Sequence, residues 1–328
     1  MDIRYEILRT LRESRDSLSG QELSRQLGIT RTAVWKHIRA LEEEGYEIEA
    51  VNRKGYRLAG VPDTIAAREV QSRLETKRMG KEIRYFSTIG STNQYAKKIA
   101  EEGAASGTLV IADEQTAGKG RRGRSWVTPP GETIAFTLLL RPKLSPDRVS
   151  MVTLVMGLAV AKAVNTLYPL KAGIKWPNDV VINGKKLCGI LTEMSAEVMH
   201  VNHIVIGVGI NANMTSFPKE LSRIATSLKL ELGRDVSRAE LIAQVMAEFE
   251  RLYEKFEEDG DLRAVSEEYN ALCLNAESMV RVLDPNGEYT GTSHGINALG
   301  ELLVETESGQ VRNVYAGEVS VRGVYGYV

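Results

Sequence analysis

The chain has 328 residues, which favours two or three domains, and its 43% apolar content is enough to build real hydrophobic cores. Its 42 basic and 43 acidic residues give a formal net charge of −1, which excludes a protein that coats nucleic acid or anionic membrane by bulk charge. Two cysteines are too few for a disulfide framework, and the chain has neither a secretory leader nor an uncharged apolar run near the roughly 20 residues of a membrane span, so we expect a cytoplasmic protein outside the membrane.

The first sixty residues predict three helices followed by a hairpin. An apolar stripe at helical spacing predicts a first helix from residue 3 to about 11, and Ser19 resembles the start of a second. Helical spacing resumes over 31–41 after a tight break at Gly28. Two alternating segments, 46–51 and 55–58, then predict a short hairpin, and residues 61–63 are interpreted as a linker.

From residue 64 to about 262 the pattern mixes strands and helices. We expect strands at 83–86, 108–113, 133–140, 180–182, 186–193 and 201–208, and helices at 92–102, 149–167 and 238–256. Asn183-Gly184 between two apolar runs is a strong hairpin signal, so the sheet should be largely antiparallel or mixed. From residue 278 onward, short runs broken by turn residues predict a small all-β domain without a catalytic signature.

The second helix of the N-terminal helix–turn–helix pair carries a basic face. No acidic residue occurs between Leu23 and Leu41, and Thr30 can cap the helix. The side chains expected to meet phosphates and base edges in a major groove are Arg31, Thr32, Trp35, Lys36 and Arg39, with Arg53 and Lys54 on the hairpin as a basic wing. This combination resembles a winged helix-turn-helix domain. The alternative is a protein-interaction domain with solvated charges, because residues 1–60 hold 11 basic and 10 acidic side chains.

A loop of seven residues, 118–124, contains three glycines and four cations in the order Gly-Lys-Gly-Arg-Arg-Gly-Arg. Glycines let the backbone approach a ligand closely, and the cations demand an anion. The spacing matches neither a Walker A loop nor a dinucleotide-binding fingerprint. We interpret the loop as a phosphate-binding segment, and the alternative is a disordered Arg/Gly-rich surface or an RNA-binding tail.

Further motifs place polar groups at the ends of predicted strands and helices. In Lys-Trp-Pro-Asn-Asp at 175–179, the proline fixes a strand exit and directs donors and acceptors into one site. Lys186 then begins an apolar strand, where a charge is unusual. The alternative is that Lys186 is a gatekeeper lysine on an edge strand. Ser-Thr-Asn at 91–93 opens a helix and offers hydroxyl, amide and free backbone N–H groups to a polar ligand, although a plain helix cap is the alternative. The segment 207–213, rich in glycine and asparagine, is a weak signal by itself.

Taken in this order, the motifs closely resemble those of the bifunctional biotin–protein ligase and biotin operon repressor family, the biotin–[acetyl-CoA-carboxylase] ligases, along the whole chain. The family's Lys-Trp-Pro-Asn-Asp stands unchanged at 175–179 and its Lys-Leu-x-Gly-Ile-Leu at 186–191. Its loop pattern is matched except that Lys119 replaces the first arginine, which keeps the charge and loses the planar bidentate fork. The resemblance implies an α+β chain with a winged helix-turn-helix DNA-binding domain at 1–62, a mixed-sheet catalytic domain at 63–274 and an SH3-like β domain at 275–328.

The resemblance also implies a reaction. Biotin and ATP give biotinoyl-5′-AMP and pyrophosphate, and the biotinoyl group passes to a lysine of a biotin carboxyl carrier domain. Two anions meet in the first step, so catalysis should depend on positioning and charge neutralisation. The implied catalytic residues are Lys186 and Arg121. The implied biotin-binding residues are Ser91, Thr92, Asn93, Gln115, Lys119, Gly120, Arg121, Lys186 and Gly189. The implied ATP-binding residues are Arg121, Arg124, Lys175, Asn178, Lys186 and Asn211.

Cofactors and partners follow from the same resemblance. Mg²⁺ should accompany ATP, held mainly by phosphates and by Asn178 or Asp179, with no dedicated metal site and no tightly bound cofactor. The partners are the carrier domain, operator DNA and a second copy of the chain, with the adenylate promoting the homodimer and acting as co-repressor. Trp126 is expected to be either a lid over the adenylate or a core residue. The C-terminal β domain is expected to brace the active site or to meet the carrier.

Three alternatives remain open. A lipoate or octanoate ligase could share the central fold. The chain could be a ligand-responsive transcription factor without ligase activity, although its Lys186 and Arg121 argue against that. It could also be a ligase whose N-terminal domain no longer binds DNA.

Overall fold

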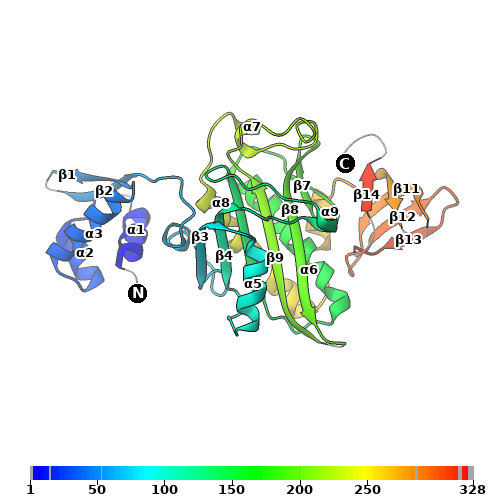
Figure 1. The fold of residues 1–328 in the computed structure, drawn as a ribbon, viewed down its shortest axis with the longest axis horizontal. Coiled ribbons are helices and arrows are strands. Elements are labelled where there is room, and N and C mark those ends of the chain that lie inside the picture. Colours follow the sequence, from blue (N-terminus) through cyan, green and yellow to red (C-terminus); the bar gives the residue numbers. More distant parts are fainter. Residues whose placement is uncertain are drawn as a thin grey trace.

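Three units follow one another along the longest axis of the computed structural model, which describes residues 3–14, 16–52, 54–198, 200–284, 287–316 and 320–323. A helical N-terminal unit lies at one end, a sheet with helices lies in the centre, and a small β unit lies at the other end (Figure 1).

The N-terminal unit contains the three helices and the hairpin that the sequence predicts. Its elements are α1 (Ile3–Glu13), α2 (Gly20–Leu27), α3 (Arg31–Glu43), β1 (Glu47–Val51) and β2 (Gly55–Gly60). Ser19 caps α2 by accepting from the backbone N–H of Glu22 at 3.1 Å, and Thr30 caps α3 by accepting from Ala33 N–H at 3.2 Å. Gly28 closes α2 with a φ of 65°. These local signals explain why the helix starts could be predicted.

A buried ionic cluster joins the N-terminal unit to the central one. Glu69 of α4 (Ala67–Gln71) is 1% exposed, and its carboxylate accepts from Arg12 of α1 at 2.9 and 3.2 Å. Arg73 donates to the same carboxylate at 2.6 Å, and the Tyr46 hydroxyl donates at 2.8 Å. Burial and the neighbouring carboxylate raise the pKa of Tyr46. We call Arg12, Tyr46, Glu69 and Arg73 the Glu69 cluster.

The linker is also tied to the central sheet. Arg238, 2% exposed at the start of α8 (Arg238–Asp259), donates to Asp63 in the linker at 2.8 Å. It donates as well to Asp113 at 2.5 Å and to the Thr133 carbonyl at 3.1 Å. One buried guanidinium therefore connects the linker with two strands of the sheet.

The central sheet has seven strands in the order β3-β4-β5-β9-β8-β7-β6. The strands are β3 (Ile83–Ile89), β4 (Leu109–Gln115), β5 (Thr133–Leu140), β6 (Gly173–Lys175), β7 (Asp179–Ile182), β8 (Lys185–Ala196) and β9 (Val201–Asn211). β3 and β4 are parallel and the other pairs are antiparallel, which confirms the expected mixed sheet. The three-residue β6 was not predicted, because so short a strand has no periodicity of its own.

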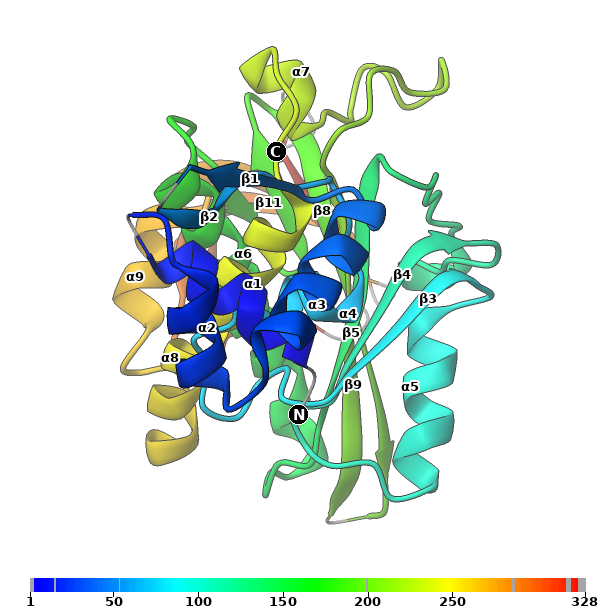
Figure 2. The same ribbon diagram turned by 90° about the vertical axis from the view of Figure 1, so that its left-hand side faces the viewer.

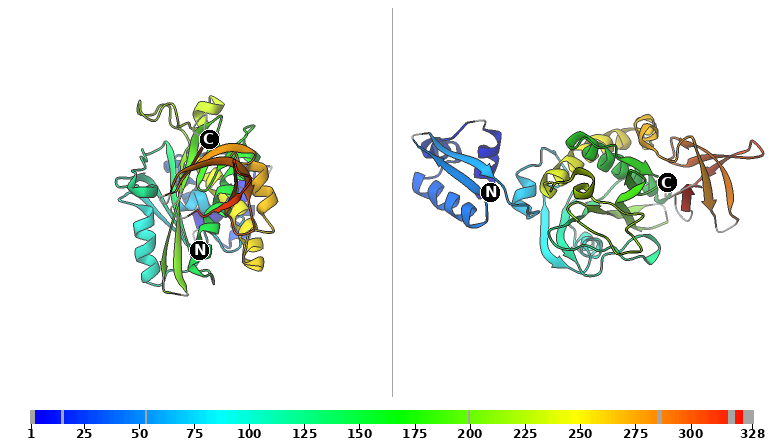
Figure 3. Two further views of the ribbon diagram at one scale, coloured as in Figure 1. Left: turned by 90° about the vertical axis from the view of Figure 1, so that its right-hand side faces the viewer. Right: turned by 90° about the horizontal axis from the view of Figure 1, so that it is seen from above.

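Helices cover both faces of the sheet (Figure 2; Figure 3). On one face lie α6 (Val149–Leu167), α8 (Arg238–Asp259) and α9 (Ser266–Leu272), and on the other lies α5 (Thr92–Glu101); the short α7 (Leu228–Leu232) follows β9. The segment Pro146–Leu167 is long and apolar enough to cross a membrane by length and composition. Because 72% of its apolar window is buried inside the fold, it is the core helix of the central unit. Both cysteines are buried free thiols, as expected.

The C-terminal unit is all antiparallel β structure, as predicted. Its strands are β10 (Ser278–Leu283), β11 (Tyr289–Ile296), β12 (Leu302–Thr306), β13 (Val311–Val314) and β14 (Ser320–Gly323), in the order β13-β12-β11-β10-β14. Trp176 anchors this unit, because its indole N–H donates to the Gly300 carbonyl at 3.1 Å and its backbone N–H donates to Asn275 Oδ1 at 2.7 Å. The unit thus braces the strand exit at 175–179.

Candidate functional site

The floor of the site is a strip of the central sheet without large side chains. Ala112, Ala135, Gly209 and Gly189 are successive cross-strand partners on β4, β5, β9 and β8, and Asp179 of β7 continues the row. Residues directly opposite each other point to the same face of a sheet. The row therefore leaves a trough on the face that carries α5.

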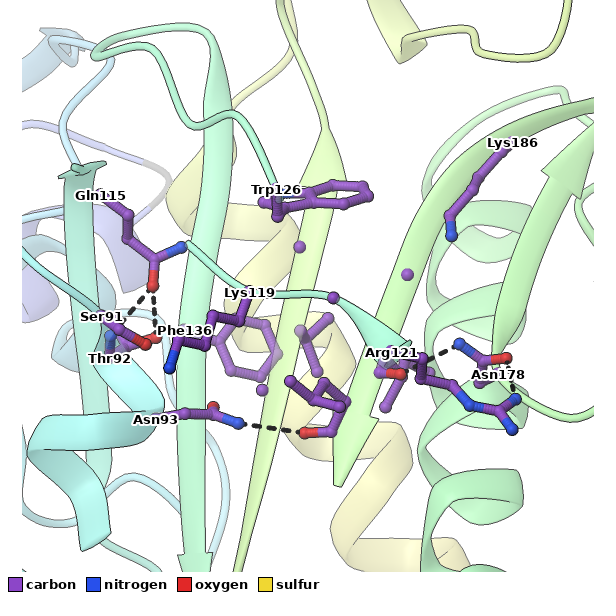
Figure 4. Close-up of a pocket in the computed structure, with 17 residues that line it drawn as sticks. Ser91, Thr92, Asn93, Gln115, Lys119, Arg121, Trp126, Phe136, Asn178 and Lys186 are labelled. Atoms are coloured by element: carbon purple, nitrogen blue, oxygen red, sulfur yellow. Dashed lines mark hydrogen bonds between the residues drawn. The ribbon is translucent and has the colours of Figure 1, made fainter. Parts of the chain in front are cut away.

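This trough opens into a pocket with about 480 Å³ of empty space, including its mouth. The pocket collects residues that lie far apart in the chain, from Ser91 to Gly209 (Figure 4). The predicted site residues that line it are Ser91, Thr92, Asn93, Gln115, Lys119, Gly120, Arg121, Asn178, Lys186 and Gly189. The lining residues that the prediction did not include are Phe136, Ile190, Leu191, Gly207, Val208 and Gly209, together with Trp126, whose role was open. The alternating glycines of β9 were the available signal for this wall.

One end of the pocket is polar and is built at the start of α5. The backbone N–H and the hydroxyl of Thr92 both donate to Gln115 Oε1, at 2.9 and 3.0 Å. The expectation of free backbone N–H groups is therefore wrong at Thr92. Ser91 occupies the N-cap position, but its side chain makes no capping hydrogen bond, so the alternative of a plain cap is wrong as well. Figure 4 shows the Ser91 and Thr92 side chains beside Gln115 at this end of the pocket.

The other end of the pocket is cationic. Lys186 Nζ lies 2.7 Å from Asp179 Oδ1, and Arg121 donates to Asn178 Oδ1 at 2.8 Å. Arg121 also reaches the C-terminal unit, where it donates to the Ala316 carbonyl at 3.2 Å. Burial lowers the pKa of Arg121, an effect that the nearby carboxylate of Asp179 opposes. Because β8 lies between β9 and β7, the interpretation of Lys186 as an edge-strand lysine is wrong.

Trp126 stands over the glycine floor. A Cβ atom on Gly209 would collide with its indole ring, and Lys186 Nζ lies 5.6 Å from the ring centroid. The indole Nε1 is buried and has no hydrogen-bond partner among the residues that the structure describes. Trp126 therefore lines the pocket, and its polar N–H is held where a ligand atom could accept from it.

The loop that carries Trp126 is a closed turn. The N–H of Gly120 donates to the Arg124 carbonyl at 2.7 Å, and Trp126 N–H donates to the Gly118 carbonyl at 2.9 Å. Arg122 has a φ of 56°, a left-handed conformation that is unusual for a residue with a side chain. A Cβ on Gly118 would collide with the Trp126 carbonyl, which explains why that position needs glycine.

Three predicted ATP-binding residues do not line the pocket. Arg124 is exposed on the loop, and Lys175 is mostly buried on β6. Asn211, at the end of β9, donates to the Thr226 carbonyl at 3.0 Å. Among the residues that the structure describes, no cluster of three or more histidine, cysteine or acidic side chains could hold a metal ion.

The predicted DNA-contacting side chains of α3 are all exposed: Arg31, Thr32, Trp35, Lys36 and Arg39. Trp35 is 50% exposed and lies under the Arg39 guanidinium, 5.6 Å from the ring centroid. Arg39 also pairs with Glu42 at 2.9 Å, and this carboxylate partly neutralises the charge of the guanidinium. Lys54 is exposed, whereas Arg53 lies outside the described residues. The helix pair occupies the end of the molecule farthest from the C-terminal unit (Figure 1).

Family comparisons divide the chain in the same way as the fold. The model of the biotin/lipoate A/B protein ligase family matches residues 85–211, which include every residue that lines the pocket. An HTH domain model matches residues 4–57, and the model of the biotin protein ligase C terminal domain matches residues 277–322.

Whole-chain relatives agree with these matches. The bifunctional ligase/repressor BirA of Bacillus spizizenii is 41% identical over 308 residues, which cover 93% of this chain and 94% of that protein. The protein of the same name from Escherichia coli is 32% identical over 305 residues and covers 93% of this chain and 92% of its own length. Among solved structures, the biotin protein ligase from Aquifex aeolicus in complex with biotin and ATP has 30% identity and a TM-score of 0.65, covering 74% of this chain and 99% of that one.

Proposed function

This chain belongs to the biotin–protein ligase family, in its group of bifunctional ligase/repressors, and we propose the following roles for its residues. It is an ATP-dependent biotin–protein ligase and a transcriptional repressor. One observation carries the assignment of the site: a single pocket has a hydroxyl and amide end at Ser91 and Gln115 and a cationic end at Lys186 and Arg121.

The polar end suits the cyclic urea of biotin. Ser91, Thr92 and Gln115 offer hydroxyl and amide groups to its N–H and C=O groups, and the trough over Gly209 and Gly189 leaves room for the fused rings and the aliphatic chain. Bound in this direction, biotin has its carboxylate at the cationic end.

The cationic end suits the first chemical step. A biotin carboxylate oxygen attacks the α-phosphorus of ATP, the new C–O–P bond forms, and the bond to pyrophosphate breaks. Lys186 and Arg121 are the proposed catalytic residues, because they neutralise the two anions where these approach one another. Lys119 and Gly120 would bind the chain of biotin from the loop.

The triphosphate extends beyond the described pocket in this proposal. Arg124, Lys175 and Asn211 would contact it together with Asn178. Mg²⁺ would neutralise charge on the bound phosphates, and the carboxylate of Asp179 and the amide oxygen of Asn178 are oxygen donors of the kind that this ion prefers.

The second step transfers biotin to a protein. The amine of a carrier-domain lysine attacks the acyl carbon of the adenylate, an amide forms, and AMP leaves. Trp126 and the 118–124 loop would keep water away from the adenylate until the carrier arrives.

Repression would use the exposed face of α3 on operator DNA, with Lys54 on the wing. We propose that the adenylate promotes a homodimer that presents two such faces to a two-fold operator. We further propose domain boundaries at 62/63 and 274/275. The second boundary is supported by Leu274, whose backbone N–H donates to the Ile174 carbonyl at 2.8 Å and so belongs with the central sheet. A cytoplasmic location fits buried free thiols and a DNA partner.

The test of the ligase site uses labelled biotin, ATP and a carrier domain. We expect wild-type protein to label the carrier and to catalyse biotin-dependent exchange between pyrophosphate and ATP. We expect Lys186→Ala to lose both while remaining folded. Exchange with lipoate or octanoate but not with biotin would contradict the substrate, and no exchange at all would favour a repressor without ligase activity.

The test of the repressor role uses sedimentation and a gel shift. Biotin with ATP should increase both self-association and operator affinity. No change in association would contradict the dimer proposal, and no operator shift under any condition would indicate a ligase that has lost DNA binding.

A further inference from the structure

The Asn93 side chain at the polar end contacts the protein through both atoms of its amide. It is 6% exposed on the first turn of α5, and its side chain reaches across to β8 (Figure 4). Its Nδ2 donates to the Leu191 carbonyl at 3.2 Å and to Glu193 Oε2 at 2.8 Å. Its Oδ1 lies 2.7 Å from the Thr137 hydroxyl, whose single proton is shared between Asn93 Oδ1 and Thr92 Oγ1, the latter at 2.8 Å. Both amide hydrogens are therefore donated to the protein, and one lone pair of the oxygen is still available.

A salt bridge holds the carboxylate of Glu193, which accepts a hydrogen bond from Asn93. Lys97, one turn further along α5, places its Nζ 2.7 Å from Glu193 Oε1, so the carboxylate binds Lys97 with one oxygen and Asn93 with the other. Although burial opposes it, these two hydrogen bonds hold the pKa of Glu193 below its usual range. Lys119 adds a weaker attraction from the loop above the pocket.

An ionised carboxylate accepts hydrogen bonds and cannot donate them. While Glu193 is ionised, the Asn93 amide must turn its Nδ2 toward β8 and its Oδ1 toward Gly207, another residue of the pocket wall. A Cβ atom on Gly207 would collide with Asn93 Oδ1, so the glycine provides the space for the oxygen.

We propose that Glu193 and Lys97 are positioning residues that fix the Asn93 amide with its oxygen toward the pocket, and so select ligands with an N–H donor at this position, such as a cyclic urea. The inference rests on the proposed biotin site and deepens it. If Glu193 were neutral, its side chain could donate to Asn93 Oδ1, and a flipped amide would present its NH₂ to the N–H of the ligand. A pocket with the flipped amide would then bind the cyclic urea less tightly.

The first test is Glu193→Gln in the full-length protein, measured by biotin-dependent pyrophosphate exchange. We expect the KM for biotin to rise about 10-fold, the scale of one misdirected hydrogen bond, while kcat stays within about twofold and the KM for ATP is unchanged. The matched controls are Lys98→Met and Glu102→Gln, which break an exposed pair on the same helix with a separation of 3.8 Å. Both controls should leave every constant unchanged.

The second test is a pH profile of Lys97→Met. Without its cation, Glu193 should bind a proton at higher pH than in the wild type. We expect the KM for biotin of Lys97→Met to be near the wild-type value at pH 8 and to rise toward that of Glu193→Gln as the pH is lowered. The wild type and Glu193→Gln should show no such trend. A purely structural role would weaken the protein without this pH dependence of KM.

The outcomes distinguish a failure of this positioning role from a failure of the proposed function. If the folded Glu193→Gln protein keeps the wild-type KM for biotin, or if Lys97→Met shows no pH trend, the positioning role is wrong and the ligase site stands. If kcat and the KM for ATP change as much as the KM for biotin, the pair acts on the whole fold and the inference is also wrong. If the wild type shows no biotin-dependent exchange, both the proposed function and this inference fail.

Discussion

The Lys186 ammonium lies 2.7 Å from a carboxylate oxygen of Asp179, and the two side chains come from neighbouring interior strands. They are only 26% and 14% exposed, so the pair is partly desolvated and the position of the cation is well defined. A phosphate bound in the proposed position would therefore compete with Asp179 for the same ammonium.

Replacing Lys186 tests the importance of that cation. We expect Lys186→Met to lower kcat/KM for adenylate formation about 10²–10³-fold, because charge neutralisation is lost where the two anions meet. Lys186→Arg keeps the charge and should lose less. The control is Lys185→Met, which changes the exposed neighbour. Pyrophosphate exchange measures all three, and a Lys186→Met enzyme with near wild-type exchange would contradict the assignment.

Gly209→Ala tests the glycine floor under Trp126. A Cβ at this position would collide with the indole, so the ring must move away from residue 209. We expect the KM for biotin to rise at least 10-fold and the tryptophan fluorescence to change. Gly157→Ala is the matched control, because a Cβ at that buried helical position meets only ordinary contacts at 3.8 Å. Unchanged biotin binding in Gly209→Ala would show that the floor tolerates side chains.

Glu69→Gln tests the attachment of the N-terminal unit. Removing the charge leaves Arg12 and Arg73 without their carboxylate, a change that typically costs about 3–5 kcal/mol when the pair is buried. We expect the linker to become sensitive to protease and operator affinity to fall about 10-fold, with adenylate formation within twofold of wild type. Glu13→Gln, which breaks an exposed pair with Arg9 on α1, is the control. Equal operator affinities in gel shifts would contradict a role for the Glu69 cluster in orienting the unit.

Glu268 gives a prediction about pH. Although burial opposes it, hydrogen bonds from Lys162, Arg251 and Lys255 lower the pKa of Glu268 to about 2, below the 4.5 of an unpaired glutamate. The stabilisation is therefore complete above about pH 4.5 and is lost as the pH falls toward 2. After allowance for solvent screening, we expect Glu268→Gln to lower the free energy of unfolding at pH 7 by on the order of 1 kcal/mol.

Urea unfolding of the central unit measures the effect of Glu268→Gln. The difference from wild type should be present at pH 7 and shrink between pH 4 and pH 2, whereas Glu267→Gln at the exposed neighbour should show no difference. A difference that is the same at both ends of this range would mean that the ion pairs are not its cause.

Elements and motifs whose signals lie close together in the chain could be predicted from the sequence. The caps at Ser19 and Thr30, the turn at Asn183-Gly184 and the apolar periodicity of α6 are local, because a helix or a tight turn is specified by residues within a few positions. The polar character of 91–93 likewise needed only neighbouring residues. The interpretation of 118–124 as a phosphate-binding segment also came from neighbouring residues, and it stays a prediction. The sequence by itself therefore determined the mixed sheet and the order of the three units, and its resemblance to the ligase family gave ten of the residues that line the pocket.

The tertiary structure decided which of those residues meet and what holds them. The row from Ala112 to Asp179 depends on the register of five strands, and a shift of one residue would turn the small side chains to the other face. Glu193 lies 100 positions from Asn93, and Arg121 lies 195 positions from Ala316. No local pattern in the sequence reports such pairs, because they form only when the sheet closes and the C-terminal unit packs against it.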